Sequence, residues 1–349
     1  MKIGIICGKT NEEYLDKALV KKIPKKYKSP SKGFICTDVA LVYLMKERFP
    51  DHTIDLIMPK DITNSRLQKN DINIPIGYDI INAINDDPYI KKFAGKSGID
   101  KLDKIYQNKK NKIFPSYDFM SFIWDKKKYL QVLQKNKIPI SPTIFIKDTV
   151  NPKKLIQQIQ KYRWKDFIIK PIGGTTSFGL GKFTLKDCLK DLSELFEYFE
   201  ENNEIYSEYL VQELITGFSD HGEIKSFWID GKYSYAVNII DKTHINESNY
   251  KVEEVIDPKV REQITKIGNQ VINALPKISF NRKKVLPALV RIDFTCCINN
   301  KKFSPSNYFV NEIESDIAGT YINYKNVKYP MLEVMADTYI KKAKELGLK

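Results

Sequence analysis

The sequence predicts a mixed α/β protein in which a parallel sheet comes first and α+β segments follow. Strand-like and helical patterns alternate over residues 1–115, an order typical of parallel sheets. Later in the chain, two strand-like runs on either side of Asp230-Gly231 are typical of an antiparallel hairpin. At 349 residues the chain is long enough for two or three domains, or for one domain with lobes.

The N-terminal elements are predicted from short apolar runs. A helical pattern over residues 38–45 separates the first expected strand from the next, and the strands are expected at 2–7, 53–58 and 71–76. Residues 95–115 are polar and rich in lysine, so we interpret them as a connection.

The rest of the chain mixes helices with strands. Two of its expected helices begin with a capping residue followed by proline, and the helices are expected over 125–136, 151–162, 186–201 and 257–275. Strands are expected at 143–146, 167–169, 209–212, 223–229 and 233–240. A further pair of strands and a short helix end the chain.

The composition excludes several classes of protein. With 42% hydrophobic and 29% charged residues and no apolar run of about 18 residues, we expect a soluble globular protein without a membrane helix. A strand pattern begins at residue 2, so we expect no secretory signal. Five cysteines without a Cys-x-x-Cys pair and three scattered histidines argue against a zinc site or a histidine-based triad. Free thiols and a reducing, cytoplasmic location are the simplest expectation.

The net charge of +14 comes from lysines along the whole chain. Such charge can steer a protein toward nucleic acid or another polyanion. No recognition-helix, zinc-finger or base-stacking motif accompanies it, so we expect no specific nucleic-acid partner. We interpret the charge as diffuse and useful for anionic substrates.

Two strand-like segments near the C-terminus carry the strongest chemical signal. In the first, Arg291 and Asp293 share one face, and in the second, Glu312 and Glu314 share one face with Asn311 and Ile313 opposite. Antiparallel pairing would gather three carboxylates and one guanidinium on one patch. The carboxylates would repel one another unless a cation sat among them, and oxygen ligands suit Mg²⁺. An ordinary hairpin with a solvated acidic face is the alternative that this segment leaves open.

A glycine-rich loop follows the expected strand at 167–169. Its glycines let the backbone approach an anion, and Lys170 at its start could neutralise phosphate charge. The alternative is a flexible turn, because the loop lacks the lysine of a Walker A motif. The phosphate-binding candidates in this loop are Gly173, Gly174, Thr175, Thr176, Ser177 and Gly179.

A short link between strands could read an adenine base. Its backbone would offer donors and acceptors to the base edge, and it consists of Gln212, Glu213, Leu214 and Ile215. On the following strand, Glu223 and Lys225 share a face that suits a ribose hydroxyl and a phosphate. A surface ion pair with little energetic effect is the alternative for these two residues.

In their order and spacing, these segments resemble the ATP-grasp superfamily over roughly residues 120–320. Asp125-Lys126 looks like the family's entry segment with its first nucleotide lysine, and Lys170 with its loop resembles the second lysine and the phosphate flap. Residues 212–215 look like the adenine-binding hinge. The Glu223–Lys225 strand is similar to a family strand that commonly carries arginine in place of Lys225. Arg291 to Asp293 and Asn311 to Glu314 resemble the two metal strands, although many relatives carry asparagine where this chain has Glu314.

The resemblance implies an ATP-grasp fold with three parts. These are a Rossmann-like N-terminal domain over residues 1–115, a central lobe with the flap over 116–210, and a C-terminal lobe with the metal site over 211–349. It also implies ATP and one or two Mg²⁺ ions, or Mn²⁺, as cofactors. The metal ligands would be Asp293, Glu312 and Glu314.

The family resemblance further implies a carboxylate–amine or thiol ligase, as in D-alanine–D-alanine ligases, glutathione synthetases and ribosomal-protein glutamate ligases. ATP would phosphorylate a carboxylate, and an amine would displace the phosphate. Arg291 and Lys170 would be the catalytic residues because they stabilise charge in transit. A small-molecule kinase and a catalytically silent nucleotide-binding protein are the alternatives. The partners would be small carboxylate and amine substrates, with a homodimer as a further expectation. We expect Asp293→Asn and Glu312→Gln to abolish turnover and leave the fold intact.

Overall fold

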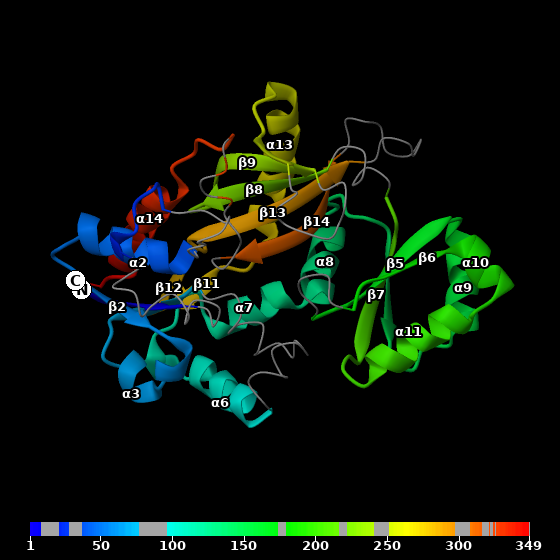
Figure 1. Cartoon of the computed structure of the whole chain (residues 1–349), viewed down its shortest axis with the longest axis horizontal. Helices are drawn as coiled ribbons and strands as arrows, with labels where there is room; N and C mark the ends of the chain where they lie inside the picture. The colour runs from blue at the N-terminus through cyan, green and yellow to red at the C-terminus, as the bar shows by residue number, and fades with distance from the viewer. Residues whose placement is uncertain are drawn as a thin grey trace.

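The computed structural model describes residues 1–7, 21–27, 37–76, 96–173, 179–215, 222–240, 251–296, 308–315, 321, 324 and 326–348. Three parallel strands form the N-terminal sheet, as the sequence predicts. β1 (Lys2–Ile6) lies between β2 (Thr53–Ile57) and β3 (Ile72–Pro75). Helix α2 (Thr37–Arg48) packs on this sheet and also on the C-terminal helix α14 (Met331–Glu345) (Figure 1).

Residues 95–115 contain helix rather than a plain connection. They include α6 (Lys96–Gln107) and the short turn η3 (Lys109–Asn111). Ile105 and Tyr106 are buried, while the neighbouring Lys104 is exposed. The prediction was wrong because the lysines that suggested a loop lie on the solvent face of an amphipathic helix. Two other short elements, η2 (Pro59–Asp61) and α3 (Asn64–Leu67), follow β2.

The central lobe is a four-stranded antiparallel sheet with helices on one side (Figure 1). Its strand order is β4 (Thr143–Lys147), β7 (Glu208–Glu213), β5 (Asp166–Pro171) and β6 (Gly181–Thr184). The apolar faces of these strands and of α9 (Pro152–Tyr162) form one core, which includes Phe167, Tyr209 and Ile159. The side chain of Asn151 caps α9, as the Asn-Pro pair predicts.

The single helix expected over 186–201 is divided in two. α10 (Leu185–Lys190) ends at Asp191, and α11 (Ser193–Asn203) begins two residues later. The Asp191 carboxylate accepts a hydrogen bond of 2.9 Å from the backbone N–H of Ser193. Aspartate competes with the helix for backbone donors in this way, so the chain turns between the two helices.

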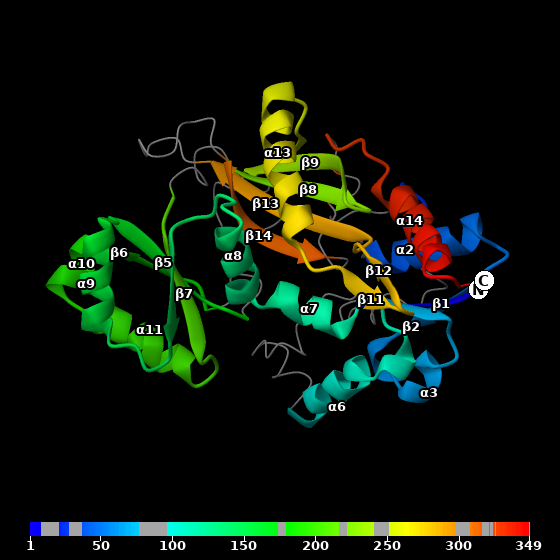
Figure 2. The same ribbon diagram turned by 180° about the vertical axis from the view of Figure 1, so that it is seen from behind.

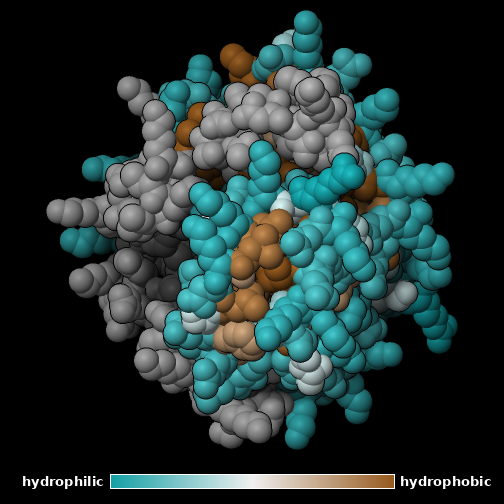
Figure 3. All heavy atoms as spheres, turned by 90° about the vertical axis from the view of Figure 1, so that its right-hand side faces the viewer, coloured by the Kyte–Doolittle hydropathy of each residue, from teal (hydrophilic) through white to brown (hydrophobic). Residues whose placement is uncertain are grey.

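The outer face of the central lobe carries a small apolar area surrounded by hydrophilic side chains (Figure 3). Large apolar side chains of this lobe that remain exposed are Tyr162, Leu189 and Phe196. A small exposed apolar area of this kind is common on soluble proteins.

The C-terminal lobe is built on a five-stranded antiparallel sheet. Its strand order is β10 (Lys251–Glu254), β9 (Lys232–Ile240), β8 (Glu223–Ile229), β13 (Leu289–Cys296) and β14 (Tyr308–Ser315). The hairpin of β8 and β9 turns at Asp230 and Gly231, as predicted, and both have positive φ. A small separate sheet consists of β11 (Ile278–Phe280) and β12 (Lys283–Val285).

Helix α13 (Pro258–Ala274) covers the rear face of the five-stranded sheet (Figure 2). Gly268 lies so close to the Trp228 ring of β8 that a Cβ atom there would come within 2.0 Å of it. Because Trp228 occupies the rear face, the alternation of β8 leaves Glu223, Lys225 and Phe227 on the front face. This front face is where the candidate site lies.

Two helices and a link join the lobes. α7 (Tyr117–Trp124) packs against β14, and α8 (Lys126–Lys135) packs against α13. The link after α8 then pairs with the edge of the sheet, because the backbone N–H of Val310 donates to the carbonyl oxygen of Pro139 at 2.9 Å. The segment between the lobes is therefore hydrogen-bonded directly to β14.

The domain boundaries at residues 115 and 210 stay a prediction. Among the helices in the described part of the chain, none combines the length and apolar character that a membrane crossing requires.

Candidate functional site

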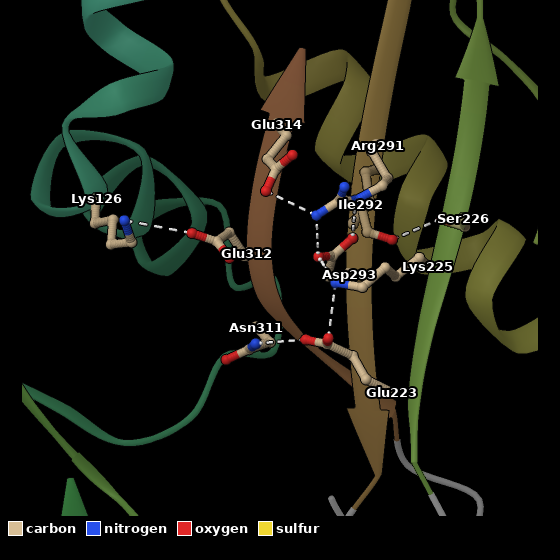
Figure 4. Close-up of polar contacts among 10 residues, drawn as sticks. All are labelled: Lys126, Glu223, Lys225, Ser226, Arg291, Ile292, Asp293, Asn311, Glu312 and Glu314. Atoms are coloured by element: carbon tan, nitrogen blue, oxygen red, sulfur yellow. Dashed lines mark hydrogen bonds and ion pairs between the residues drawn. The ribbon is translucent and has the colours of Figure 1, made fainter. Parts of the chain in front are cut away.

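Three carboxylates converge on the front face of the five-stranded sheet (Figure 4). β13 and β14 pair antiparallel with Asp293 opposite Glu312 and Arg291 opposite Glu314, so the predicted pairing is confirmed. Each of the three acids offers one oxygen, and these oxygens all lie within 4.8 Å of one another. Oxygen atoms at this spacing are a suitable donor set for a divalent cation such as Mg²⁺.

Arg291 holds two of these carboxylates. Its Nε donates to Oδ1 of Asp293 at 2.7 Å, and its Nη2 donates to Oδ2 at 2.8 Å. The same Nη2 forms an ion pair of 2.7 Å with Oε1 of Glu314. Asp293 is fully buried, and burial raises its pKa, but Arg291 and then Lys225 lower that pKa by more. Asp293 is therefore held as the carboxylate.

Lys225 on β8 adds a second cation to Asp293. The register places Lys225 directly opposite Asp293, and its Nζ lies 2.7 Å from Oδ2. Nζ also lies 2.8 Å from Oε2 of Glu223, two residues earlier on the same face. Burial and Arg291 lower the pKa of Lys225, but Asp293 and Glu223 raise it well above its usual value. The ammonium group is therefore charged.

Glu312 is held by lysines from the other side. Lys126 begins helix α8 after the cap Asp125, whose carboxylate accepts from the backbone N–H of Lys128 at 3.0 Å. Nζ of Lys126 lies 3.3 Å from Oε1 of Glu312. Burial raises the pKa of Glu312, and Lys126 and Lys170 lower it by more. Lys170 comes from β5 of the central lobe, and Lys225 of β8 lowers the pKa of Glu312 as well, so both lobes supply positive charge to this carboxylate.

For Lys170 and Glu314, burial shifts the pKa toward the neutral form of the side chain by more than the neighbouring charges oppose it. Burial lowers the pKa of Lys170, Glu312 raises it, and the net pKa lies below the usual value. Burial also raises the pKa of Glu314 to about 7, with Arg291 opposing the rise and Glu312 adding to it. A cation placed among the acids would favour the charged form of Glu314.

Comparisons with known proteins support one fold. No model of a known protein family matches the sequence, and no curated protein matches it. Among solved structures, D-cycloserine synthetase DcsG is 11% identical with a TM-score of 0.65, and the alignment covers 98% of this chain and 99% of that chain. D-alanine–D-alanine ligase from Bacillus anthracis complexed with ATP is 16% identical with a TM-score of 0.58, covering 99% of each chain.

A third solved structure is named after its fold. The ATP-grasp ligase PsnB, complexed with minimal precursor, Mg and ADP, is 13% identical with a TM-score of 0.54. That alignment covers 97% of this chain and 96% of that chain. The chain has the ATP-grasp fold. At identities this low, the likeness concerns the architecture, and the predicted Rossmann-like domain and α+β lobes are confirmed with it.

Within the ATP-grasp fold, the expected phosphate loop joins β5 to β6. Gly173 and Gly179 are described, and Gly179 has φ +70 with its carbonyl oxygen accepting a hydrogen bond of 2.6 Å from the Tyr198 hydroxyl. The other predicted residues of this loop lie outside the described residues, namely Gly174, Thr175, Thr176 and Ser177.

The expected adenine segment lies at the end of β7. The buried Gln212 side chain donates to the Thr143 hydroxyl at 2.9 Å, so its amide links β7 to β4 within the sheet. The backbone N–H of Glu213 donates to Pro142, and that of Leu214 donates to Asp166. In the described part of the chain, the carbonyl oxygen of Leu214 and the N–H of Ile215 have no such partner. These two groups are therefore available for a base edge.

Two neighbours of the site were missed from the sequence. Asn311 was expected to face away from Glu312, yet its Nδ2 donates to Oε1 of Glu223 at 2.7 Å. A β-bulge opposite Asp293 and Phe294 adds one residue to β14 and turns Asn311 to the front face. Burial raises the pKa of Tyr321 to about 12, while Lys225 and Arg291 lower it, which places this ring beside the site. No pattern in the sequence indicates either residue.

Proposed function

We propose that this protein is an ATP- and Mg²⁺-dependent ligase that joins a carboxylate to an amine. The observation that carries the proposal is the set of three carboxylates within 4.8 Å, surrounded by basic side chains of both lobes of an ATP-grasp fold. Such a set has no nucleophile or triad, and it suits chemistry that needs positioned charge.

The metal ligands in this proposal are Asp293, Glu312 and Glu314. Their oxygens are of the hard type that Mg²⁺ or Mn²⁺ prefers, and Glu312 is the most accessible of the three because 30% of its side chain is exposed. When bound, one or two divalent ions would neutralise the phosphate chain of ATP and orient it for transfer.

The basic residues of the site handle negative charge as it moves. Lys126 and Lys170 would bind the phosphate groups, and Arg291 would stabilise the phosphoryl group in transfer and later the tetrahedral intermediate. The γ-phosphoryl group passes to a carboxylate oxygen, which gives ADP and an acyl phosphate. The amine then attacks the acyl carbon, the C–O bond to phosphate breaks, and the amine loses a proton. Closure of residues 173–181 would exclude the water that hydrolyses acyl phosphates.

The adenine and ribose of the nucleotide would lie where β7 ends. The carbonyl oxygen of Leu214 and the N–H of Ile215 would pair with the adenine edge. Glu223 would accept from a ribose hydroxyl, since both of its oxygens already face the site through Asn311 and Lys225. Lys225 would contact phosphate.

The substrates in this proposal are a small carboxylate and an amine, of the amino-acid or peptide class. The likeness to proteins named as a D-alanine–D-alanine ligase and a D-cycloserine synthetase supports this class. A reducing, cytoplasmic location agrees with the buried Cys7, Cys188 and Cys296, which form no disulfide within the part of the chain that the structure describes. The homodimer stays a prediction.

The test measures ADP and inorganic phosphate together. Purified protein with Mg-ATP is incubated with fractionated amino-acid and metabolite pools. We expect equal amounts of ADP and phosphate that depend on two pools at once. ADP without phosphate would indicate a kinase and contradict the ligase, and no product from any pool would favour a silent nucleotide-binding protein.

A further inference from the structure

Asp293 accepts three hydrogen bonds from two cations, and among its lone pairs only one, on Oδ1, is left for a further ligand. Its Oδ1 accepts from Nε of Arg291 at 2.7 Å. Its Oδ2 accepts from Nη2 of Arg291 at 2.8 Å and from Nζ of Lys225 at 2.7 Å. A carboxylate oxygen has two lone pairs, so Oδ2 is saturated by these two cations. A divalent ion can bind this oxygen only if one of the two donors withdraws.

Lys225 is the donor that can withdraw at lower cost. The guanidinium of Arg291 makes a two-pronged contact with Asp293 and also holds Glu314 at 2.7 Å, so its withdrawal breaks three contacts. The ammonium of Lys225 makes one contact with Asp293, at the end of a flexible four-carbon stem. Its second partner is Oε2 of Glu223, which lies 2.8 Å from the same Nζ, so the ammonium group keeps one anionic partner when it leaves Asp293.

Basic and acidic side chains occur in equal number at the site. Four basic groups face four acids on this front face: Lys126, Lys170, Lys225 and Arg291 with Glu223, Asp293, Glu312 and Glu314. A divalent ion that enters alone adds charge beside an ammonium group that already occupies Asp293. Like charges at a few ångströms in a buried site repel strongly.

We infer that Lys225 is an internal counter-cation that competes with a divalent ion for Asp293, so that the ion binds tightly only together with a nucleotide. This inference rests on the metal site of the proposed function and adds a rule for its occupancy. Phosphate groups bound at the site would offer the ammonium a new anionic partner, and Lys225 would turn toward them while its Nζ stays paired with Glu223. Withdrawal from Asp293 then exchanges one ion pair for another and frees Oδ2 for the metal.

The exchange of partners by Lys225 involves only neighbouring side chains of the sheet. Lys225, Asp293 and Glu312 lie opposite one another on β8, β13 and β14. An ion that enters from the side of Glu312 meets Asp293 next and Lys225 last (Figure 4). A rotation of one lysine side chain is therefore sufficient, and no strand has to move. Lys225 is a positioning residue in this scheme.

The experiment measures Mn²⁺ binding by the electron paramagnetic resonance signal of the free ion, without turnover. The full chain is titrated with and without a non-hydrolysable ATP analogue. We expect the analogue to tighten Mn²⁺ binding by a factor in the usual range for coupled sites, about 5- to 150-fold. In Lys225→Met, nucleotide-free binding should tighten by about tenfold or more, and the effect of the analogue should shrink correspondingly.

Two variants serve as controls. Lys225→Arg keeps the charge and should leave nucleotide-free Mn²⁺ binding as weak as in the unmodified chain. Lys127→Met makes the same chemical change at a lysine paired with Glu208 at 2.6 Å outside the carboxylate cluster, and it should change nothing. Lys225→Gln is the second neutral variant in case the methionine variant does not fold, as judged by circular dichroism.

The outcomes separate this inference from the proposed function. If nucleotide-free binding stays unchanged or weakens in both neutral variants while the analogue still promotes Mn²⁺ binding, the counter-cation role is wrong and the metal site stands. If the unmodified chain binds Mn²⁺ equally well with and without the analogue, the role is also wrong. If no variant binds Mn²⁺ under either condition, the metal site and the proposed function are both overturned.

Discussion

Two antiparallel strand pairs carry the residues proposed for the phosphate end of the nucleotide, and they do so differently. On β13 and β14 the charged side chains belong to the strands, so the pleat and the register decide where they point. On β5 and β6 the proposed contacts belong mainly to the connection at residues 172–180. The strand-borne groups are paired with one another through ion pairs, whereas the described β5–β6 pairing runs only from Asp166 to Ile169, before most of the proposed contacts. In the proposed function, the chemistry of the first pair therefore relies partly on residues that also stabilise the sheet, Arg291 and Asp293 above all, whereas that of the second pair relies mainly on its connection.

The largest expected effect is on turnover at the strand pair. Glu312→Gln keeps the shape of the side chain and removes the ligand charge, so we expect kcat to fall on the order of 10²–10³-fold or more. Because 30% of this side chain is exposed and its ion pair with Lys126 is long, at 3.3 Å, the fold should persist. Steady-state release of phosphate measures the effect.

Glu208→Gln is the matched control for that variant. Glu208 is also paired with one lysine, Lys127, and 35% of its side chain is exposed. We expect its turnover to stay within a factor of two or three of the unmodified chain, since surface ion pairs contribute little. Equal activity in both variants would contradict the metal assignment.

The next effect is on stability at the same strand pair. Asp293→Asn leaves the buried Arg291 and Lys225 without their common anion, so we expect the free energy of unfolding to fall by about 3–5 kcal/mol. This revises the expectation that the variant leaves the fold intact, because Asp293 is fully buried between two cations. Urea unfolding measures it, and a loss below about 1 kcal/mol would mean that the ion pairs do not support the sheet.

A smaller effect is expected where the glycine-rich connection meets the sheet. Gly179 has φ +70, and a Cβ there would lie 2.8 Å from Cγ of Pro171. Gly179→Ala should therefore destabilise the central lobe by about 1–2 kcal/mol. Thermal unfolding measures the change. A rise in the melting temperature would show that the chain relaxes into another backbone conformation at this position.

The smallest stability effect is expected within the connection itself. Thr176→Ala removes one proposed phosphate donor, so we expect ATP to bind more weakly by about 0.5–1.5 kcal/mol. The melting temperature of the nucleotide-free protein should stay the same. Calorimetric titration with ATP and a thermal scan measure the two quantities. A large loss of stability would contradict the contrast between the two strand pairs.

The contrast also explains how much was predictable. The pairing of Asp293 with Glu312 follows from alternation along two strands, which is visible in the sequence. The ion pair of Lys225 with Asp293 requires β8 to lie beside β13, and strand order is a property of the folded sheet. Asn311 was placed on the wrong face because a one-residue bulge has no sequence signature here. The helix at Lys96–Gln107 was missed because its lysine content resembles a loop.

The hydrogen bond between the link and β14 gives the site a mechanical property. Val310 receives the link through Pro139, and Glu312 lies only two residues further along the same strand. Any swing of the central lobe about this link therefore pulls first on the strand that carries Glu312 and Glu314, while Asp293 stays fixed in the middle of the sheet. In the proposed function, the spacing of the carboxylates would therefore change as the lobes open and close, because the link would transmit that movement to the proposed metal ligands of β14.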